Sequence, residues 1–172
     1  AMSKLLLKKE IKGLTRNQLE QMILDAYDPK KEIKEYFDFY VNPDVEKLTE
    51  KFKVAISREF ARNKRGYCKA RISIIKKLIK EFQAFQPGFE AQLELLHYTV
   101  TFALLSEASF YFNDTLINGI ALIMTRAVGL ADRNFVADKT LEKLTTMLDD
   151  EHAGSKYFRR FLRNSLNDFQ PS

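Results

Sequence analysis

The sequence predicts an all-α protein, and three observations support this fold class. Glycine and proline are sparse, at six and four among 172 residues, so few positions interrupt a helix. Apolar residues recur at spacings of three and four, which place them on one face of a helix. No segment bounded by turn residues shows the strict two-residue alternation of a half-buried strand. We therefore expect about eight or nine helices, joined by short connections into antiparallel helical hairpins, and no sheet.

The first two expected helices have recognisable ends. The first covers Leu5 to Lys12 and ends at Gly13. The spacing Thr15-x-x-Gln18 is that of a capping box, in which each side chain bonds the other residue's backbone N–H, so it predicts the start of a second helix.

Proline marks the starts of the next two helices. Asp28 can cap a third helix with Pro29 in its first position, and that helix is expected to reach Tyr40. Asn42-Pro43 repeats the arrangement and opens a helix that runs to about Arg62. A basic loop, Asn63 to Cys68, then leads into a fifth helix, which lasts until Pro87-Gly88.

The second half is expected to contain the centre of the fold. From Phe89 to about Phe112 the apolar residues surround the helix axis, which is typical of a helix buried from several sides. Gly129 is expected to end the following helix, and Asp132 to start the next one. The last three helices are expected over residues 115–128, 132–148 and 155–169.

The hairpins indicate a repeat-like architecture. Their expected starts near Pro43, Gly88 and Arg133 are about 45 residues apart, which is the length of a HEAT-like helix pair. An irregular HEAT-like stack and a compact multi-helix bundle both fit this pattern. We expect a single domain over residues 1–172, with Ala1 as a cloning remnant ahead of an initiator methionine.

Composition favours a cytoplasmic protein. Cys68 is the single cysteine, so the chain cannot form an internal disulfide and a reducing compartment is expected. No signal peptide is recognisable at the start of the sequence. The longest nearly uncharged stretch, residues 95–113, contains several polar residues and is a poor candidate for a membrane span.

Charge is distributed unevenly along the chain. The net charge is +5, with +8 in residues 1–86 and −3 in residues 87–172. The segment Arg58 to Lys80 holds nine basic residues against one acid, Glu59. Arginine forks and the free N–H groups of a helix start favour anions such as phosphate. The candidate anion-binding residues are Arg62, Lys64, Arg65, Lys69, Arg71, Arg160 and Arg163. The alternative is a charged surface that only faces water.

Aromatic residues give a weaker indication. Tyr36, Phe37, Phe39 and Tyr40 cover more than one face of a helix, so they predict either a core junction or a recognition patch. Tyr67 is the single ring within the basic loop, where an exposed ring could stack on a nucleic-acid base.

The residues that could carry catalysis form no complete set. Glu94 and His97 share the (i, i+3) spacing of di-iron bundles, and Glu107 is the one further inward acid on the same helix, so we expect His97 to be hydrogen-bonded rather than metal-bound. The cations around Cys68 favour its thiolate, but no histidine is tied to it by a motif. Phosphate-binding glycine motifs are absent. We therefore assign no catalytic residue, metal site or cofactor.

Three stretches resemble a family of small bacterial helical proteins of unknown function. They are residues 8–25, the aromatic block with its Asn-Pro at 35–43, and the basic segment 64–73. The resemblance covers roughly residues 4–86. It implies a bacterial, cytoplasmic protein and no particular activity.

The function expected from these observations is that of a helical interaction module that binds a protein or another acidic partner. The first alternative is a nucleic-acid-binding accessory protein that uses the basic segment 58–80. The second alternative is a metal-dependent helical enzyme. Oligomeric state has no signature in the sequence.

Overall fold

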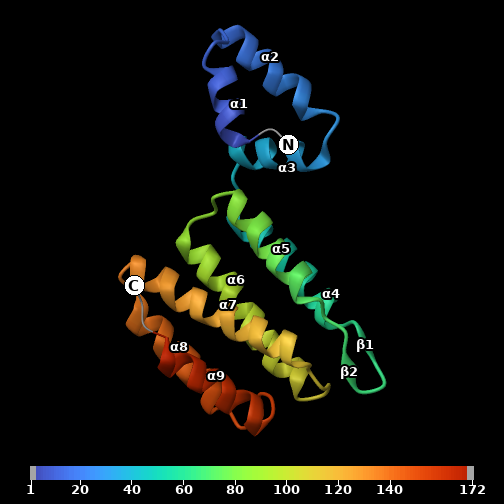
Figure 1. The fold of residues 1–172 in the computed structure, drawn as a ribbon, viewed down its shortest axis with the longest axis vertical. Coiled ribbons are helices and arrows are strands. Elements are labelled where there is room, and N and C mark those ends of the chain that lie inside the picture. Colours follow the sequence, from blue (N-terminus) through green and yellow to red (C-terminus); the bar gives the residue numbers. More distant parts are fainter. Residues whose placement is uncertain (1–2, 170–172) are drawn as a thin grey trace. The chain divides into compact units, whose positions relative to one another are not determined.

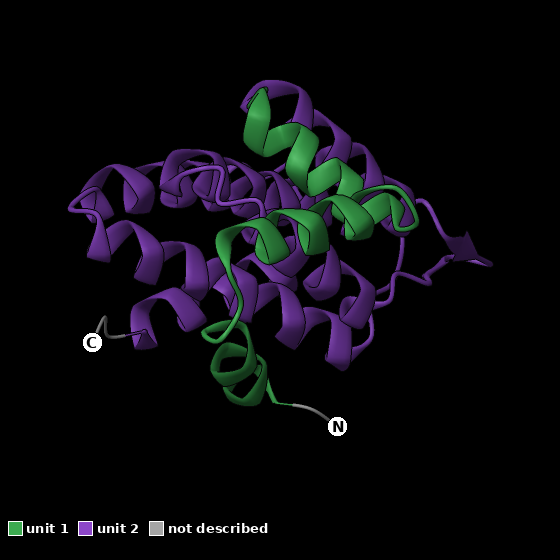
Figure 2. Cartoon of the chain, turned by 90° about the horizontal axis from the view of Figure 1, so that it is seen from above, with its two compact units in different colours: residues 1–44 green, residues 45–172 purple. Residues whose placement is uncertain are grey.

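The computed structural model describes residues 3–169 and confirms the all-α class (Figure 1). The described residues form nine helices and one short β-hairpin. Ala1, which the sequence suggests is a cloning remnant, lies outside them. The contacts of the chain gather into two compact units, Ala1–Asp44 and Val45–Ser172, shown in green and purple in Figure 2. The expectation of a single domain stays a prediction.

Unit 1 contains α1 (Lys4–Ile11), α2 (Arg16–Tyr27) and α3 (Lys31–Val41). The predicted capping box of α2 is confirmed, because Gln18 N–H donates to Thr15 Oγ1 at 3.2 Å and Thr15 N–H donates to Gln18 Oε1 at 2.9 Å. Helices α2 and α3 pack together, and the Tyr27 hydroxyl donates to the Asp38 carboxylate across them. No described residue of this unit is fully buried.

The predicted start of α3 is wrong. Asp28 keeps the right-handed helical backbone, with φ −76° and ψ −42°, and closes α2. An N-cap needs an extended backbone instead, so Asp28 cannot cap the next helix. Lys30 takes the N-cap position of α3, without a side-chain hydrogen bond, and Pro29 lies in the turn between the helices.

The aromatic block of α3 is divided between its faces. Phe37 and Phe39 are half-buried, whereas Tyr40 is 74% exposed. The rings of Tyr36 and Phe37 meet edge to face, 5.3 Å apart. The block therefore combines partial packing with exposure.

Unit 2 consists of three helical hairpins in chain order. They are α4 (Val45–Phe60) with α5 (Ile72–Ala84), α6 (Phe89–Glu107) with α7 (Asp114–Arg133), and α8 (Ala137–Asp149) with α9 (Lys156–Asp168). The middle hairpin packs against the hairpins on both sides, and α6 contacts α4, α5, α7 and α9. Its central position, predicted from the sequence, is confirmed.

The core of unit 2 contains a chain of aromatic rings. Phe60 of α4 lies 5.8 Å from Phe102 of α6 and 6.1 Å from Phe112, centroid to centroid. Phe112 lies 5.6 Å from Phe158 of α9. At the other end, Phe102 lies 5.7 Å from Tyr98. The rings thereby connect all three hairpins, and Phe60, Phe112 and Phe158 are at most 1% exposed.

Two predicted helix ends in the second half are wrong. Gly129 lies inside α7, which continues to Arg133, and Asp132 belongs to the same helix rather than starting α8. A glycine in a helix interior costs only about 1 kcal/mol, which is easily offset where the helix buries a long apolar face. Helix α6 ends at Glu107 instead of near Phe112, because Tyr111 pairs with the hairpin between α4 and α5.

The expectation of no sheet is wrong at the basic loop. Residues Asn63–Lys64 form β1 and Tyr67–Cys68 form β2, paired antiparallel. Arg65 and Gly66 both have positive φ, 52° and 80°, as the two central residues of a type I′ turn require. Gly66 therefore serves the hairpin turn.

Helix α7 is the one helix of the described chain whose length and composition would suffice to cross a membrane. Of its most apolar window, 56% is buried inside the structure. It was not the stretch singled out from the sequence.

Candidate binding groove and basic hairpin

Two of the predicted anion-binding arginines are bound to an internal carboxylate. Glu59 is 6% exposed, and its Oε1 accepts from Arg71 Nε at 2.8 Å, Arg71 N at 2.9 Å and Arg62 Nη1 at 3.0 Å. Hydrogen bonds from the Arg71 side chain are the main reason that the pKa of Glu59 falls to about 2. Arg62 and Arg71 therefore hold the end of α4 against the start of α5.

Three other predicted residues remain open to solvent beside these arginines. Lys64, Arg65 and Lys69 are exposed, and no ion pair or side-chain hydrogen bond involves their charged groups in the described residues. Lys64 lies in β1, Arg65 in the turn and Lys69 just after β2. They are the uncommitted cations in and directly after the hairpin that an external anion could reach.

The structure places Tyr111 beside this hairpin. Cys68 N–H donates to Tyr111 O at 3.0 Å, and Tyr111 N–H donates to Gly66 O at 2.7 Å. The rings of Tyr67 and Tyr111 meet edge to face, 5.5 Å apart. Sequence reasoning singled out Tyr67 but missed Tyr111, since no local signal connects residues so far apart in the chain.

Cys68 is not a reactive thiol in this structure. Its side chain is 8% exposed and lies 3.7 Å from the Phe60 carbonyl oxygen. Burial raises the pKa of the thiol above its usual value. The expectation of a stabilised thiolate is therefore wrong, because loss of water outweighs the surrounding cations.

The predicted cations of α9 have different surroundings. Arg163 Nη2 donates to Leu148 O at 3.0 Å and to Asp149 Oδ1 at 2.7 Å, so it binds the C-terminal end of α8. Arg160 is exposed. Of these two residues, Arg163 has a structural role that the charge pattern did not indicate.

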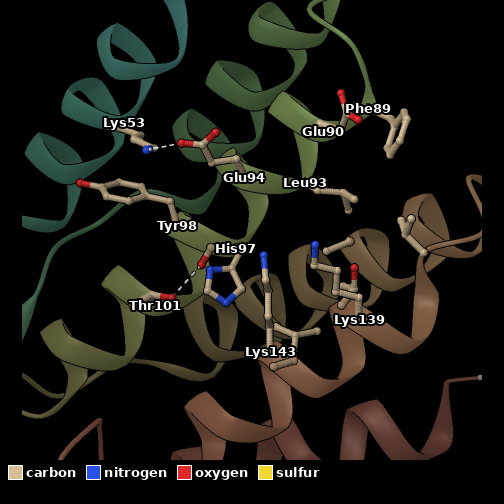
Figure 3. A pocket seen from close by; sticks show the side chains of 14 residues that line it. Lys53, Phe89, Glu90, Leu93, Glu94, His97, Tyr98, Thr101, Lys139 and Lys143 are labelled. Atoms are coloured by element: carbon tan, nitrogen blue, oxygen red, sulfur yellow. Dashed lines mark hydrogen bonds and ion pairs between the residues drawn. The ribbon is translucent and has the colours of Figure 1, made fainter. Parts of the chain in front are cut away.

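A groove of about 610 Å³ lies between α6 and α8 (Figure 3). Both helices pack on α7, and Ala127 of α7 contributes to the groove lining. Phe89, the first residue of α6, and Val136, directly before α8, line one end of the groove. At the other end Thr101 Oγ1 contacts Met147 Sδ at 2.9 Å. The α6 residues from Glu90 to Thr101 span about three helical turns, or roughly 17 Å.

The charged groups around the groove differ in their partners. Lys53 Nζ donates to Glu94 Oε1 at 2.6 Å, and this pair neutralises itself. Lys139 and Lys143 are exposed, one turn apart on α8, and form no ion pair within the described residues. Glu90 is the unpaired acid of the opposite wall. The uncommitted charge is therefore two lysines against one glutamate.

His97 contradicts the expectation of a hydrogen-bonded core histidine. Its Nε2 is buried, and no described residue bonds to it. Burial is the main reason that the pKa of His97 is lowered, and Lys143 lowers it further. Figure 3 shows the imidazole beside Lys143, on the wall of the groove.

The residues considered for a metal site do not come together. Glu94 is paired with Lys53, and both Glu107 carboxylate oxygens accept from Ser155, which caps α9. Residues 3–169 contain no group of three histidine, cysteine, aspartate or glutamate side chains that could hold a metal ion. The geometry therefore gives the metalloenzyme alternative no support.

Phe135 directly precedes Val136, which lines the groove between α6 and α8. It is 96% exposed and has φ 59°. Val136 N–H donates to Ala131 O and Phe135 N–H donates to Asp132 O, which is the Schellman motif that ends many helices. Phe135 occupies the left-handed position that favours glycine. Sequence reasoning missed this residue.

The comparisons with known proteins give a family but no function. No curated protein and no solved structure matches the chain. One family model matches, and the match extends well beyond the residues 4–86 that carried the resemblance. Because it covers residues 2–153, the chain belongs to this family, the family of unknown function DUF6155.

Proposed function

We propose that the protein is a helical interaction module whose α6–α8 groove binds an acidic, amphipathic segment of a partner protein. The observation that carries this proposal is Phe135. A large ring that is 96% exposed gains almost nothing from folding, and the left-handed backbone costs about 1–2 kcal/mol. Val136, the neighbour of Phe135, lines the groove, and aromatic residues, phenylalanine included, are enriched in protein interfaces.

The dimensions of the groove support a helical partner segment. About three turns of α6 face the groove, and the half-buried Phe89, Leu93 and Val136 supply apolar lining. A partner helix of similar length could place apolar side chains at spacings of three and four against this lining.

The charges support an acidic segment. Lys139 and Lys143 are spaced by four residues on α8, so two carboxylates one turn apart on the partner could pair with them. We propose that this binding takes place in the cytoplasm of a bacterium, supported by the single cysteine and by the resemblance described above.

A display selection tests the proposal. A library of random peptides of about 14 residues is selected on the whole protein, and enriched peptides are measured by fluorescence anisotropy. We expect amphipathic sequences with acidic residues spaced by three or four. Phe135→Ala and the double variant Lys139→Glu, Lys143→Glu should each weaken their binding about tenfold or more.

Matched substitutions outside the groove serve as controls. Tyr157→Ala removes a ring that is 65% exposed on α9, and Lys80→Glu reverses an exposed charge on α5. Both should leave peptide affinity unchanged. Enriched peptides that are basic, or that bind the groove variants as tightly as the wild type, would show that the proposal is wrong.

A further inference from the structure

The β-hairpin presents one outward face. Asn63 pairs with Cys68 and Lys64 with Tyr67. Residues paired across an antiparallel ladder lie on the same face, and successive residues lie on opposite faces. Since Cys68 points inward and is buried, Tyr67 and Lys64 point outward. Figures 1 and 2 show the hairpin projecting beyond the helices of unit 2.

Tyr111 extends this outward face. It forms a bridge to Tyr67, and the backbone hydrogen bonds on both sides of Tyr67 fix its position. Tyr67 is 58% exposed and Tyr111 is 62% exposed, although their rings touch each other. The hairpin therefore holds two adjacent aromatic rings in water on a fixed backbone.

Three cations lie in or directly after the hairpin that carries Tyr67. Lys64 is the cross-strand partner of Tyr67, Arg65 forms the tip of the turn, and Lys69 follows β2. The one carboxylate of this basic segment, Glu59, is buried and bonded by two arginines, so it does not neutralise these three side chains. The face thus combines exposed rings with uncommitted positive charge.

We propose that this face binds single-stranded nucleic acid, with bases stacked on Tyr67 and Tyr111 and phosphates near Lys64, Arg65 and Lys69. Exposed rings offer stacking surfaces to unpaired bases, and the flanking cations follow the phosphate backbone. The bases of a duplex are stacked on one another and cannot reach the rings. An acidic peptide would use the cations but has no need of two adjacent exposed rings.

This inference is independent of the proposed groove. The hairpin follows α4, whereas the groove is formed mainly by α6 and α8, and the two surfaces share no residue. Either proposal can therefore fail while the other holds.

Fluorescence anisotropy with labelled oligonucleotides tests the inference. The probes are a 15-nucleotide oligo(U), the corresponding oligo(dT) and a duplex of equal length, each titrated with the whole protein at about 50 and 200 mM salt. We expect saturable binding of the single strands that weakens strongly with salt. The double variant Tyr67→Ala, Tyr111→Ala should lose about tenfold or more in single-strand affinity and leave duplex affinity unchanged.

Conservative variants separate stacking from folding. Replacing both tyrosines by phenylalanine keeps the rings and should change single-strand affinity by no more than about twofold. Lys64→Gln with Arg65→Asn removes two charges, and asparagine tolerates the left-handed backbone of the turn. This pair should weaken binding and reduce its salt dependence. Tyr157→Ala and Lys156→Gln serve as controls for a ring and a charge on α9, outside the basic segment.

Four results would overturn the inference. The first is the absence of saturable single-strand binding at about 50 mM salt, and the second is duplex binding as tight as single-strand binding. The third is equal single-strand affinity for the wild type and the alanine double variant. The fourth is a loss of acidic-peptide affinity in that variant. The last result would identify the hairpin as a surface for proteins. If the alanine variant fails to fold by circular dichroism, the charge variant decides the outcome by the same titrations.

Discussion

Replacing Phe135 by glycine should stabilise the fold and abolish partner binding at the same time. The residue occupies the left-handed C′ position of the Schellman motif after α7, with φ 59°, and its ring is 96% exposed. The fold therefore gains little from the phenylalanine side chain, and it bears the cost of the backbone conformation. Partner binding, under the proposed function, depends on the same ring.

The magnitude follows from two opposing terms. Glycine removes the left-handed penalty of about 1–2 kcal/mol, but it also raises the conformational entropy of the unfolded chain by about 0.5–1 kcal/mol. The burial lost with the ring is negligible because the ring is already in water. The free energy of unfolding should rise by about 0.5–1 kcal/mol. For a chain of this size, that corresponds to an increase in Tm of about 1–4 °C.

Urea unfolding and calorimetry of the wild type, Phe135→Gly and Phe135→Ala check this reasoning. Phe135→Ala is the matched control, because it removes the ring and keeps the strained backbone, so its stability should lie within about 0.5 kcal/mol of the wild type. Both variants should lose affinity for the selected peptides alike. A glycine variant no more stable than the alanine variant would refute the assigned strain.

Three further predictions concern unit 2. The pKa of Glu59 is lowered from 4.5 to about 2 in the folded state, so its contribution to stability, up to about 3 kcal/mol, is fully present above pH 4.5 and is lost as the pH falls toward 2. Glu59→Gln should therefore flatten the pH dependence of the unfolding free energy in that range. An unchanged slope would contradict the role of Arg71. Gly119→Ala should destabilise the protein by about 1–3 kcal/mol, because the added Cβ would lie 2.1 Å from Ile72 Cγ1. This cost should exceed the gain from the higher helix propensity of alanine. Equal or higher stability in urea would show that Ile72 moves aside. Cys68 should react with a thiol reagent at pH 8 far more slowly in the native protein than in urea, since burial raises the pKa of the thiol and limits access of the reagent. Equal labelling rates in the two conditions would contradict its burial.

Local signals carried most of the fold prediction. The Thr15–Gln18 capping box depends on residues within one turn, and the distribution of apolar residues all around α6 depends on residues within a few turns. Both features were predicted correctly. The helix end predicted at Gly129 was wrong, because glycine is common just after the last residue of a helix. The sequence does not show that α7 buries an apolar face on both sides of Gly129. The hairpin was missed for a related reason, since Arg65 is an unusual residue for the first position of a type I′ turn.

The candidate sites depend on contacts between distant residues. A charge count treats Glu59 as one acid against nine bases, whereas its burial makes it the group that binds Arg62 and Arg71. For that reason charge reversal at Arg71 would remove two hydrogen bonds from the buried Glu59 carboxylate and place a second negative charge beside it, so loss of anion binding could not be separated from loss of folding. The tyrosine pair and the groove likewise appear only when the helices are placed side by side.

The aromatic chain through unit 2 has a consequence for how this unit melts. In a solenoid each repeat contacts only its neighbours, so the end repeats can fray while the middle persists. Such fraying is costly here, because Phe112 touches Phe60 of the first hairpin and Phe158 of the third, and losing either terminal hairpin would expose this buried ring in the loop of the middle one. The three hairpins should therefore exchange their slowest amide hydrogens at similar rates, as one cooperative block.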